Sequence, residues 1–346
     1  MTSVGLFRRA VEAASADLVA VLTPVNFVSS CSVLVDGGAY TVDWGDGTKV
    51  GYADGVTASA VPTANITVES DNAPTRFKIS TNTITGVDVQ QSGTLTSLFN
   101  SFTSMTNMTS FAISDTSLVA TFQIAFTGCT GLTSFPLIDT SSATTISAAW
   151  SGCTGLTSFP LIDTSLVAAF NAAWSGCTGL TAFPLIDTSA GTNIQSAWSG
   201  CTGLTAFPLI NTSLAASTVG AWKECSGLTA FPLIDTSANA NFNETWKGCT
   251  ALTTIPALDL SAGTTFSQTF DGCTGLTSLP ALATENGTGF FAMFKNCTSL
   301  VTISALDTTA NTSGLSADMF TNNSSMTSPN TSTRASLASS SGYDFN

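Results

Sequence analysis

The most regular feature of the chain is a hydrophobic pattern that returns every 24 residues over about two thirds of its length. Each repeat reads approximately C-T-G-L-T-S-F-P-L-I-D-T-S, continues through a variable stretch, and ends on F-x-x-A-W-S-G before the next cysteine. The cysteine marks the repeat at Cys129, Cys153, Cys177, Cys201, Cys225, Cys249, Cys273 and Cys297. A fixed period of this length is the signature of a stacked repeat protein.

Two short elements are predicted within each repeat. Residues 156–161 carry L-x-x-F-x-L, the spacing of a short parallel strand of leucine-rich type, which Pro160 shortens because proline donates no ladder hydrogen bond. Residues 163–165 offer side-chain oxygens for a helix N-cap, and the segment through residues 170–174 fits one or two helical turns that end at Gly176. The predicted fold is a leucine-rich-repeat-like, right-handed solenoid with a short parallel strand and a short helix in each 24-residue coil.

The rest of the chain divides where the pattern changes. Residues 1–24 place apolar side chains at helical spacing, which predicts an N-terminal helix that docks onto a partner. Residues 25–92 alternate apolar and polar positions between Gly-rich turns, as is typical of a small antiparallel β-sandwich domain. The solenoid is expected over residues 93–326 and a Ser/Thr-rich tail over 327–346. The β-domain is expected to cover the first coil, whose strand edge would otherwise be exposed.

Composition excludes several classes of function. Charged residues make up only 9% of the chain and the formal net charge is −13, so no basic cluster is available to neutralise nucleic-acid phosphates. Histidine is absent, which removes the usual general base and the commonest zinc ligand. We therefore expect no catalytic residues, no cofactor and no metal site. No membrane span or secretory signal is recognised either, so the chain is expected to fold in the cytoplasm where it is made.

Three rows of equivalent residues have competing interpretations. The cysteines are interpreted as buried free thiols, with disulfides between neighbouring coils as the alternative. The aromatic row that contains Trp198 is interpreted as core, because Trp and Phe interchange along it, with sugar stacking as the alternative. The aspartate row that contains Asp163 is interpreted as capping residues or Asx turns, with calcium bridging left open. Calcium also stays open at Asp43 and Asp46, where a tight Asp-Gly turn is favoured.

Positions that change from coil to coil are the best candidates for recognition. The residue after the aromatic is Ser, Lys or Asp, and the stretch preceding the aromatic shares little between coils, so the stack does not dictate these side chains. We expect them to be exposed and to form a binding ridge, with unselected surface as the alternative. The candidate residues of this ridge are Lys223, Lys247, Asp271, Lys295, Asn193 and Asn241.

Two motifs resemble known families. F-x-x-A-W-x-G-C followed by x-x-L-x-x-F resembles the repeat of BspA-like leucine-rich repeat proteins, whose short repeats occur in bacterial surface proteins and phage virion proteins. Residues 42–48, V-D-W-G-D-G-T, resemble the signature of PKD-like β-sandwich modules. These resemblances imply adhesion or structural display without catalysis.

The resemblances and the unrecognised export signal together define the expected function. It is that of a non-enzymatic phage virion structural protein, either a capsid decoration or a tail or fibre component, used for adhesion or particle stabilisation. The expected partners are other virion proteins or copies of the chain itself, together with a glycan or protein receptor on the host surface. Neither nucleic acid nor a membrane is an expected partner. The alternative is a bacterial cell-surface adhesin of the leucine-rich repeat class.

Overall fold

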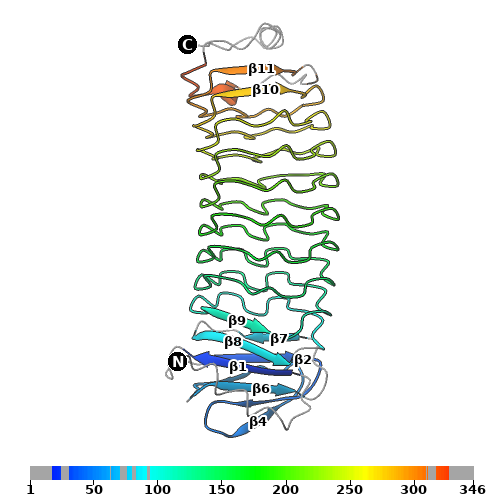
Figure 1. Cartoon of the computed structure of the whole chain (residues 1–346), viewed down its shortest axis with the longest axis vertical. Coiled ribbons are helices and arrows are strands. Elements are labelled where there is room, and N and C mark those ends of the chain that lie inside the picture. Colours follow the sequence, from blue (N-terminus) through cyan, green and yellow to red (C-terminus); the bar gives the residue numbers. More distant parts are fainter. Residues whose placement is uncertain are drawn as a thin grey trace.

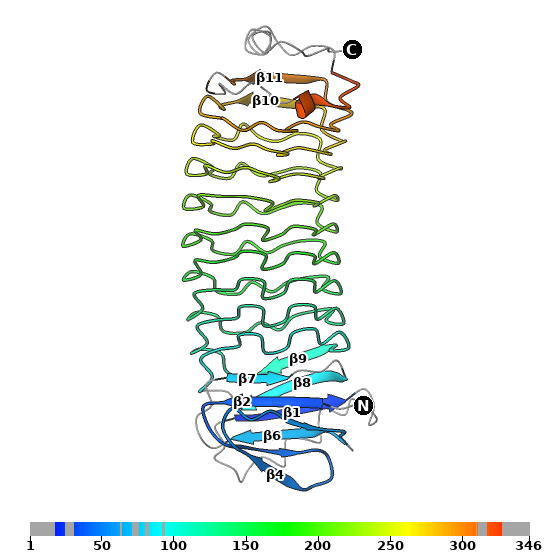
Figure 2. The ribbon, with the colours of Figure 1, turned by 180° about the vertical axis from the view of Figure 1, so that it is seen from behind.

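The computed structural model describes residues 18–24, 31–62, 64–70, 76–79, 83–91, 94–308, 310 and 317–326. Strands gather at the N-terminal end, and from them flat repeats of the chain rise one above another along the long axis (Figure 1). The view from behind shows the same order, with β1, β2 and β6 at one end and β10 and β11 at the other (Figure 2). No helix within the described ranges is long and apolar enough to cross a membrane.

The N-terminal strands form two sheets that share one apolar core. Their bounds are β1 (Leu18–Pro24), β2 (Cys31–Asp36), β3 (Tyr40–Asp43), β4 (Lys49–Tyr52), β5 (Ala58–Ala60), β6 (Ile66–Ser70), β7 (Arg76–Ile79) and β8 (Ile84–Gln91). One sheet has the order β4-β3-β6-β1-β8-β9 and the other β5-β2-β7. The buried Tyr40 joins them, because its hydroxyl on β3 donates to the carbonyl of Val33 on β2 at 3.0 Å. Buried and partly exposed residues alternate along β2 and β6, so each sheet turns one face inward.

Strand β1 contradicts the predicted N-terminal helix over the residues that the structure describes. It lies between β6 and β8 and runs antiparallel to both. Val19, Ala20 and Leu22 are buried there. The alternating apolar run is satisfied by pairing on both edges of an interior strand, and this tertiary pairing outweighs the helical spacing. The rest of the predicted helix, residues 1–17, and the tail 327–346 lie outside the described residues.

The larger sheet leads directly into the repeats. Strand β9 (Ser110–Ile113) pairs in parallel with residues 86–89 of β8, each of which faces the residue one repeat later, such as Val87 opposite Phe111. Strand β8 therefore occupies the place of a preceding repeat. Farther along, single parallel bridges join equivalent residues of neighbouring repeats, as between Thr121 and Thr145. The N-terminal sheets thus cover the first repeat and pair its backbone.

The predicted leucine-rich-repeat-like solenoid, with a strand and a helix in each coil, is wrong because the described repeats contain no α-helix. Beyond β9, the regular elements that the structure describes are β10 (Ser278–Leu282), β11 (Thr302–Leu306) and one turn of 3-10 helix, η3 (Ala317–Phe320). Residues 170–174 show the reason. The N–H groups of residues 170, 172 and 174 donate to carbonyls of the next repeat at 2.8–2.9 Å, and Ala172 has a φ of 54°. A left-handed residue at this point breaks any helical run.

The interior of the stack consists of rows of equivalent side chains. The rings of Trp174 and Trp198 are 5.7 Å apart and within 8° of parallel, and both are fully buried. The repeat cysteines are free and buried, and each donates its thiol hydrogen to a carbonyl, as from Cys177 to Trp150 at 3.1 Å. Burial raises the pKa of these thiols, to about 12 at Cys129. The predicted burial of the cysteine and aromatic rows is therefore confirmed.

The C-terminal end of the stack is covered by residues 317–326. Phe320 stacks on Phe294 with ring centroids 5.4 Å apart and an interplanar angle of 13°. The N–H of Phe294 donates to the carbonyl of Met319 at 2.9 Å. This segment therefore supplies partners for backbone groups and aromatic surface that the end of a stack would leave exposed.

Candidate interaction ridge

The six residues predicted to form a binding ridge lie on two separate rows. Lys223, Lys247, Asp271 and Lys295 directly follow the aromatic residue of four successive repeats. Backbone hydrogen bonds hold this row in register, since the carbonyl of Lys223 accepts an N–H from the preceding repeat at 2.7 Å and that of Lys247 does so at 2.6 Å. Asn193 and Asn241 belong instead to the row of residues that form parallel bridges between repeats.

The two asparagines direct their side-chain oxygens to their own backbone. Asn193 Oδ1 accepts the N–H of Gln195 at 3.1 Å, and Asn241 Oδ1 accepts the N–H of Asn243 at 3.1 Å. These are local hydrogen bonds of the Asx type, which fix a turn. The structure therefore does not bring the asparagines into contact with the charged row.

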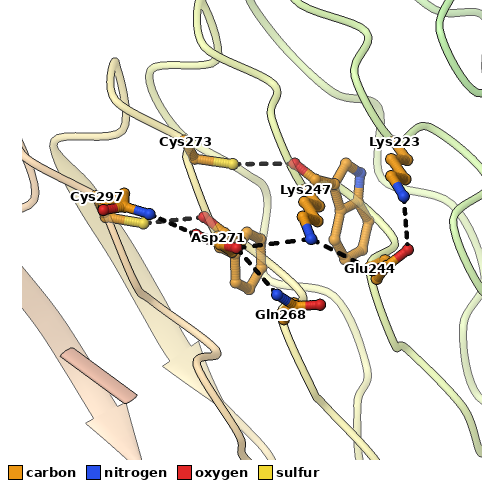
Figure 3. Close-up of polar contacts among 10 residues, drawn as sticks. Lys223, Glu244, Lys247, Gln268, Asp271, Cys273 and Cys297 are labelled. Carbon is orange, nitrogen blue, oxygen red and sulfur yellow. Dashed lines mark hydrogen bonds and ion pairs between the residues drawn. The ribbon is translucent and has the colours of Figure 1, made fainter. Parts of the chain in front are cut away.

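Glu244 is the centre of the charged row, although it was not among the predicted ridge residues. Its carboxylate accepts from Lys223 Nζ at 2.9 Å and from Lys247 Nζ at 3.3 Å. Lys247 Nζ also lies 3.7 Å from Asp271 Oδ2, so positive and negative groups alternate across successive repeats (Figure 3). A sequence signal for Glu244 exists, because its repeat position carries Ala, Ser or Gly in the preceding four repeats and turns acidic where the lysines appear.

Partial burial raises the pKa of Glu244, but the hydrogen bond from Lys223 and the charges of both lysines lower it by more, so its pKa lies below the ordinary value. The carboxylate is consequently ionised at neutral pH and the ion pairs are present. Lys295, at the far end of the row, is partly exposed. Lys223, Glu244, Lys247 and Asp271 therefore form a connected chain of ion pairs, which within the described residues does not extend to Lys295.

Asp271 is buried, contrary to the expectation that the ridge is exposed. Only 8% of the residue is accessible. Besides Lys247, it accepts from Gln268 Nε2 at 3.2 Å and from Asn296 Nδ2 at 2.9 Å. Both carboxylate oxygens therefore have donors, which compensates the cost of burying the charge. Asp271 acts as a link between repeats and offers no free acid to a ligand.

A second surface row was missed by the sequence reasoning. Five leucines that were assigned to the strand motif are instead exposed, by 60–72%. This leucine row comprises Leu137, Leu161, Leu185, Leu209 and Leu233. At Leu161 the cause is a three-residue turn, in which the N–H of Ile162 donates to the carbonyl of Pro160 at 3.1 Å. A turn this tight directs its central side chain outward while both flanking apolar residues, Phe159 and Ile162, stay buried.

The same turn, closed by an isoleucine N–H and a proline carbonyl at 3.0 Å, recurs at the next three leucines. A proline between two apolar residues was the available signal, because proline interrupts the strand pairing that would alternate side chains. The exposure of the leucine row therefore follows from the F-P-L-I sequence, which recurs in each of these repeats.

The aspartate row forms Asx turns beside the leucine row. Asp163 Oδ1 accepts both the N–H and the hydroxyl of Ser165, at 3.0 and 2.7 Å. At Asp139 the equivalent hydrogen bonds, first from the serine hydroxyl and then from its N–H, lower the pKa of the carboxyl group. The predicted Asx interpretation is thereby confirmed, without a following helix to cap. No group of three or more His, Cys, Asp or Glu side chains in the described ranges is placed to hold a metal ion.

Asp43 and Asp46 close the hairpin between β3 and β4. Asp43 Oδ1 accepts the N–H groups of Gly45 and Gly47 at 2.8 and 3.1 Å, and Asp46 Oδ1 accepts that of Thr48 at 2.8 Å. Gly45 requires its own residue type, since its φ is 96° and a Cβ would lie 2.2 Å from the backbone nitrogen of Ala64. These aspartates therefore have a turn-forming role, as favoured from the sequence.

The N-terminal sheets also carry an open hollow of about 390 Å³. Its lining includes Tyr40, Tyr52 and Glu69. Glu69 is the acidic residue of this lining, and Lys49 Nζ lies 2.5 Å from its carboxylate. The hollow thus presents a carboxylate that is ion-paired with a lysine, together with two tyrosine side chains.

In comparisons with known proteins, no family model and no curated protein sequence matches the chain. The resemblances to BspA-like repeats and PKD-like modules therefore stay predictions that depend on the quoted motifs. The charged ridge and the leucine row are the two surface features from which a function can be inferred.

Proposed function

We propose that the chain is a non-enzymatic structural protein of a phage particle, a capsid decoration or a tail or fibre component, in which the stack of repeats is a display surface. The observation that carries this proposal is that the potentially reactive side chains of the stack are either buried or held in ion pairs. The cysteines are buried with raised pKa values, which suppresses thiolate reactivity, and Lys223, Lys247 and Asp271 of the ridge are held in ion pairs. Such a stack supplies a long, regular surface for contact with other virion proteins, further copies or a host receptor.

The free thiols favour a virion over the alternative, a bacterial cell-surface adhesin. All nine cysteines are free and buried. Proteins that mature outside the cytoplasm meet oxidising conditions and commonly pair their cysteines, whereas chains that fold in a reducing compartment keep them as thiols. A virion protein folds in the host cytoplasm before the particle is released.

The experiment is to fractionate a lysed culture that produces the virus and to quantify the protein by mass spectrometry. A virion component should co-sediment with particles in a density gradient and remain after a high-salt wash, in a constant ratio to the major particle proteins. Recovery with the washed cell envelope, and none with particles, would identify the adhesin and reject the virion proposal.

A further inference from the structure

We propose that the leucine row is a self-association surface, on which a second copy of this chain packs with the two stacks side by side and parallel. The inference concerns a surface distinct from the charged ridge and does not depend on the virion assignment. It follows from three properties of the row: its leucines are not needed by the fold, its spacing is periodic, and charge flanks it on one side only.

The stack itself does not require leucine at this position. The equivalent residues of later repeats are Ala257, Ala281 and Ala305, of which the last two belong to the strands β10 and β11 (Figure 1). Because the side chain points away from the core, replacing alanine with leucine adds only exposed apolar surface. Five leucines in consecutive repeats that are exposed to water raise the free energy of a monomer, and an interface that buries them would explain why they are present.

The row is periodic, and only a surface with the same period matches it along its whole length. The phenylalanine rings beneath neighbouring leucines are 5.8–6.3 Å apart, from Phe135 to Phe231. The five leucines are each 60–72% exposed, so their apolar surface is grouped in one row, as is typical of an interaction site. Ala257, Ala281 and Ala305 extend this uncharged row along three later repeats. A second copy presents the identical period, so leucines meet leucines throughout.

Charge selects the relative direction of the two copies. On one side of the row run exposed aspartates such as Asp163 and Asp187, while on the other side the exposed residues are neutral, such as Ser158 and Ala182. A two-fold axis along the stack sets each acidic row against the neutral side of the partner. A two-fold axis across the stack would set the two acidic rows against each other, and like charges in contact are destabilising. The parallel arrangement is therefore the one that fits.

The first test measures self-association of the full chain by sedimentation equilibrium. The row variant combines Leu161→Ser, Leu185→Ser and Leu209→Ser. The matched control places the same change at three leucines that are 53–57% exposed beyond the aspartate turn: Leu118→Ser, Leu166→Ser and Leu214→Ser. Since each buried leucine contributes about tenfold or more to association, the row variant with three replaced leucines should dimerise at least about a thousandfold more weakly. The control should dimerise like the unchanged chain.

Thermal melting followed by circular dichroism tests whether both variants are folded. We expect that they are, because all six replaced leucines are exposed. A monomeric unchanged chain at high concentration overturns the proposal and indicates that the row serves a different partner. The proposal is also overturned if the row variant and the control are weakened equally in dimerisation, or if neither variant is weakened.

A second test decides the direction of packing. Leu137→Cys adds a thiol at one end of the row, on a chain whose native thiols are buried. In parallel copies this residue meets itself, so mild oxidation should give a cross-linked dimer of the single variant. Antiparallel copies would instead bring it to Leu233, so that cross-links form only when Leu137→Cys and Leu233→Cys chains are mixed. That outcome would reject the parallel arrangement.

Discussion

Replacement of Trp198 with alanine should be among the most damaging single changes in the stack. The side chain is fully buried, lies 5.7 Å from Trp174 and from Trp222 in near-parallel stacking, and meets Phe207 edge-on at 4.9 Å. Burial of about 150–250 Å² at about 25 cal/mol/Å² sets an upper estimate of about 4–6 kcal/mol. The indole N–H has no hydrogen-bond partner among the residues that the structure describes, so removing it recovers a desolvation penalty that offsets part of this loss. The expected net loss is about 3–5 kcal/mol.

The assay is equilibrium urea unfolding followed by circular dichroism, together with thermal melting. If the 346 residues unfold together, the loss corresponds to a decrease in melting temperature of roughly 5 °C. The matched control is Trp198→Phe, because phenylalanine occupies this row in other repeats and removes the unpaired N–H; it should cost less than about 1.5 kcal/mol. Equal stability of the alanine variant and the unchanged chain, or equal damage by both variants, would refute the argument that the stacked ring stabilises the core.

Native protein should resist thiol-labelling reagents at pH 8, because burial raises the pKa of thiols such as Cys177, and should react throughout once unfolded; rapid native labelling would contradict the buried row. A chain that begins at Val25 lacks β1, so the amides of β6 and β8 should lose protection from hydrogen exchange, and unchanged protection would show β1 to be dispensable. Glu244→Gln should lower stability by about 1 kcal/mol or less at low salt, because the pairs are partly exposed. The pKa of Glu244 is lowered on folding, so its contribution is present above the ordinary glutamate pKa and lost as pH falls below it; a difference from the unchanged chain that persists in acid would refute the ion-pair origin. Ala172→Gly should raise the free energy of unfolding by up to about 1 kcal/mol, because glycine relieves the strain of a left-handed alanine, whereas Ala173→Gly should lower it. The reverse order of the two variants in urea unfolding would contradict the presence of strain at Ala172.

The sequence predicted the period and the interior rows, because these follow from chemistry that is the same in every repeat. A small thiol and a large aromatic that recur at one position are buried in any stacked arrangement, as seen at Cys177 and Trp198. The Asx turn at Asp163 was also predictable, since it depends on residues two positions apart.

The helix was mispredicted because backbone geometry here is imposed by neighbouring repeats. Ala172 is a good helix former, and nothing in its own residue type signals a φ of 54°. The one sequence hint is the glycine at the equivalent Gly220. Likewise, Leu161 belongs to an apparently apolar strand until the turn at Pro160 directs it outward. Glu244 was missed because the partner that fixes its place in the charged row, Lys223, comes from the preceding repeat, 21 residues earlier.

Each repeat in the stack forms backbone hydrogen bonds with the repeats directly before and after it, and the bridging residues are offset by one full period. Removal or duplication of one 24-residue unit would therefore join two surfaces that already fit, while the covers at both ends stay unchanged. The distance between the N-terminal sheets and the far end is consequently a quantity that can be adjusted in whole steps. Recombination between near-identical repeats can therefore change the length of the stack by whole repeats without requiring a new fold.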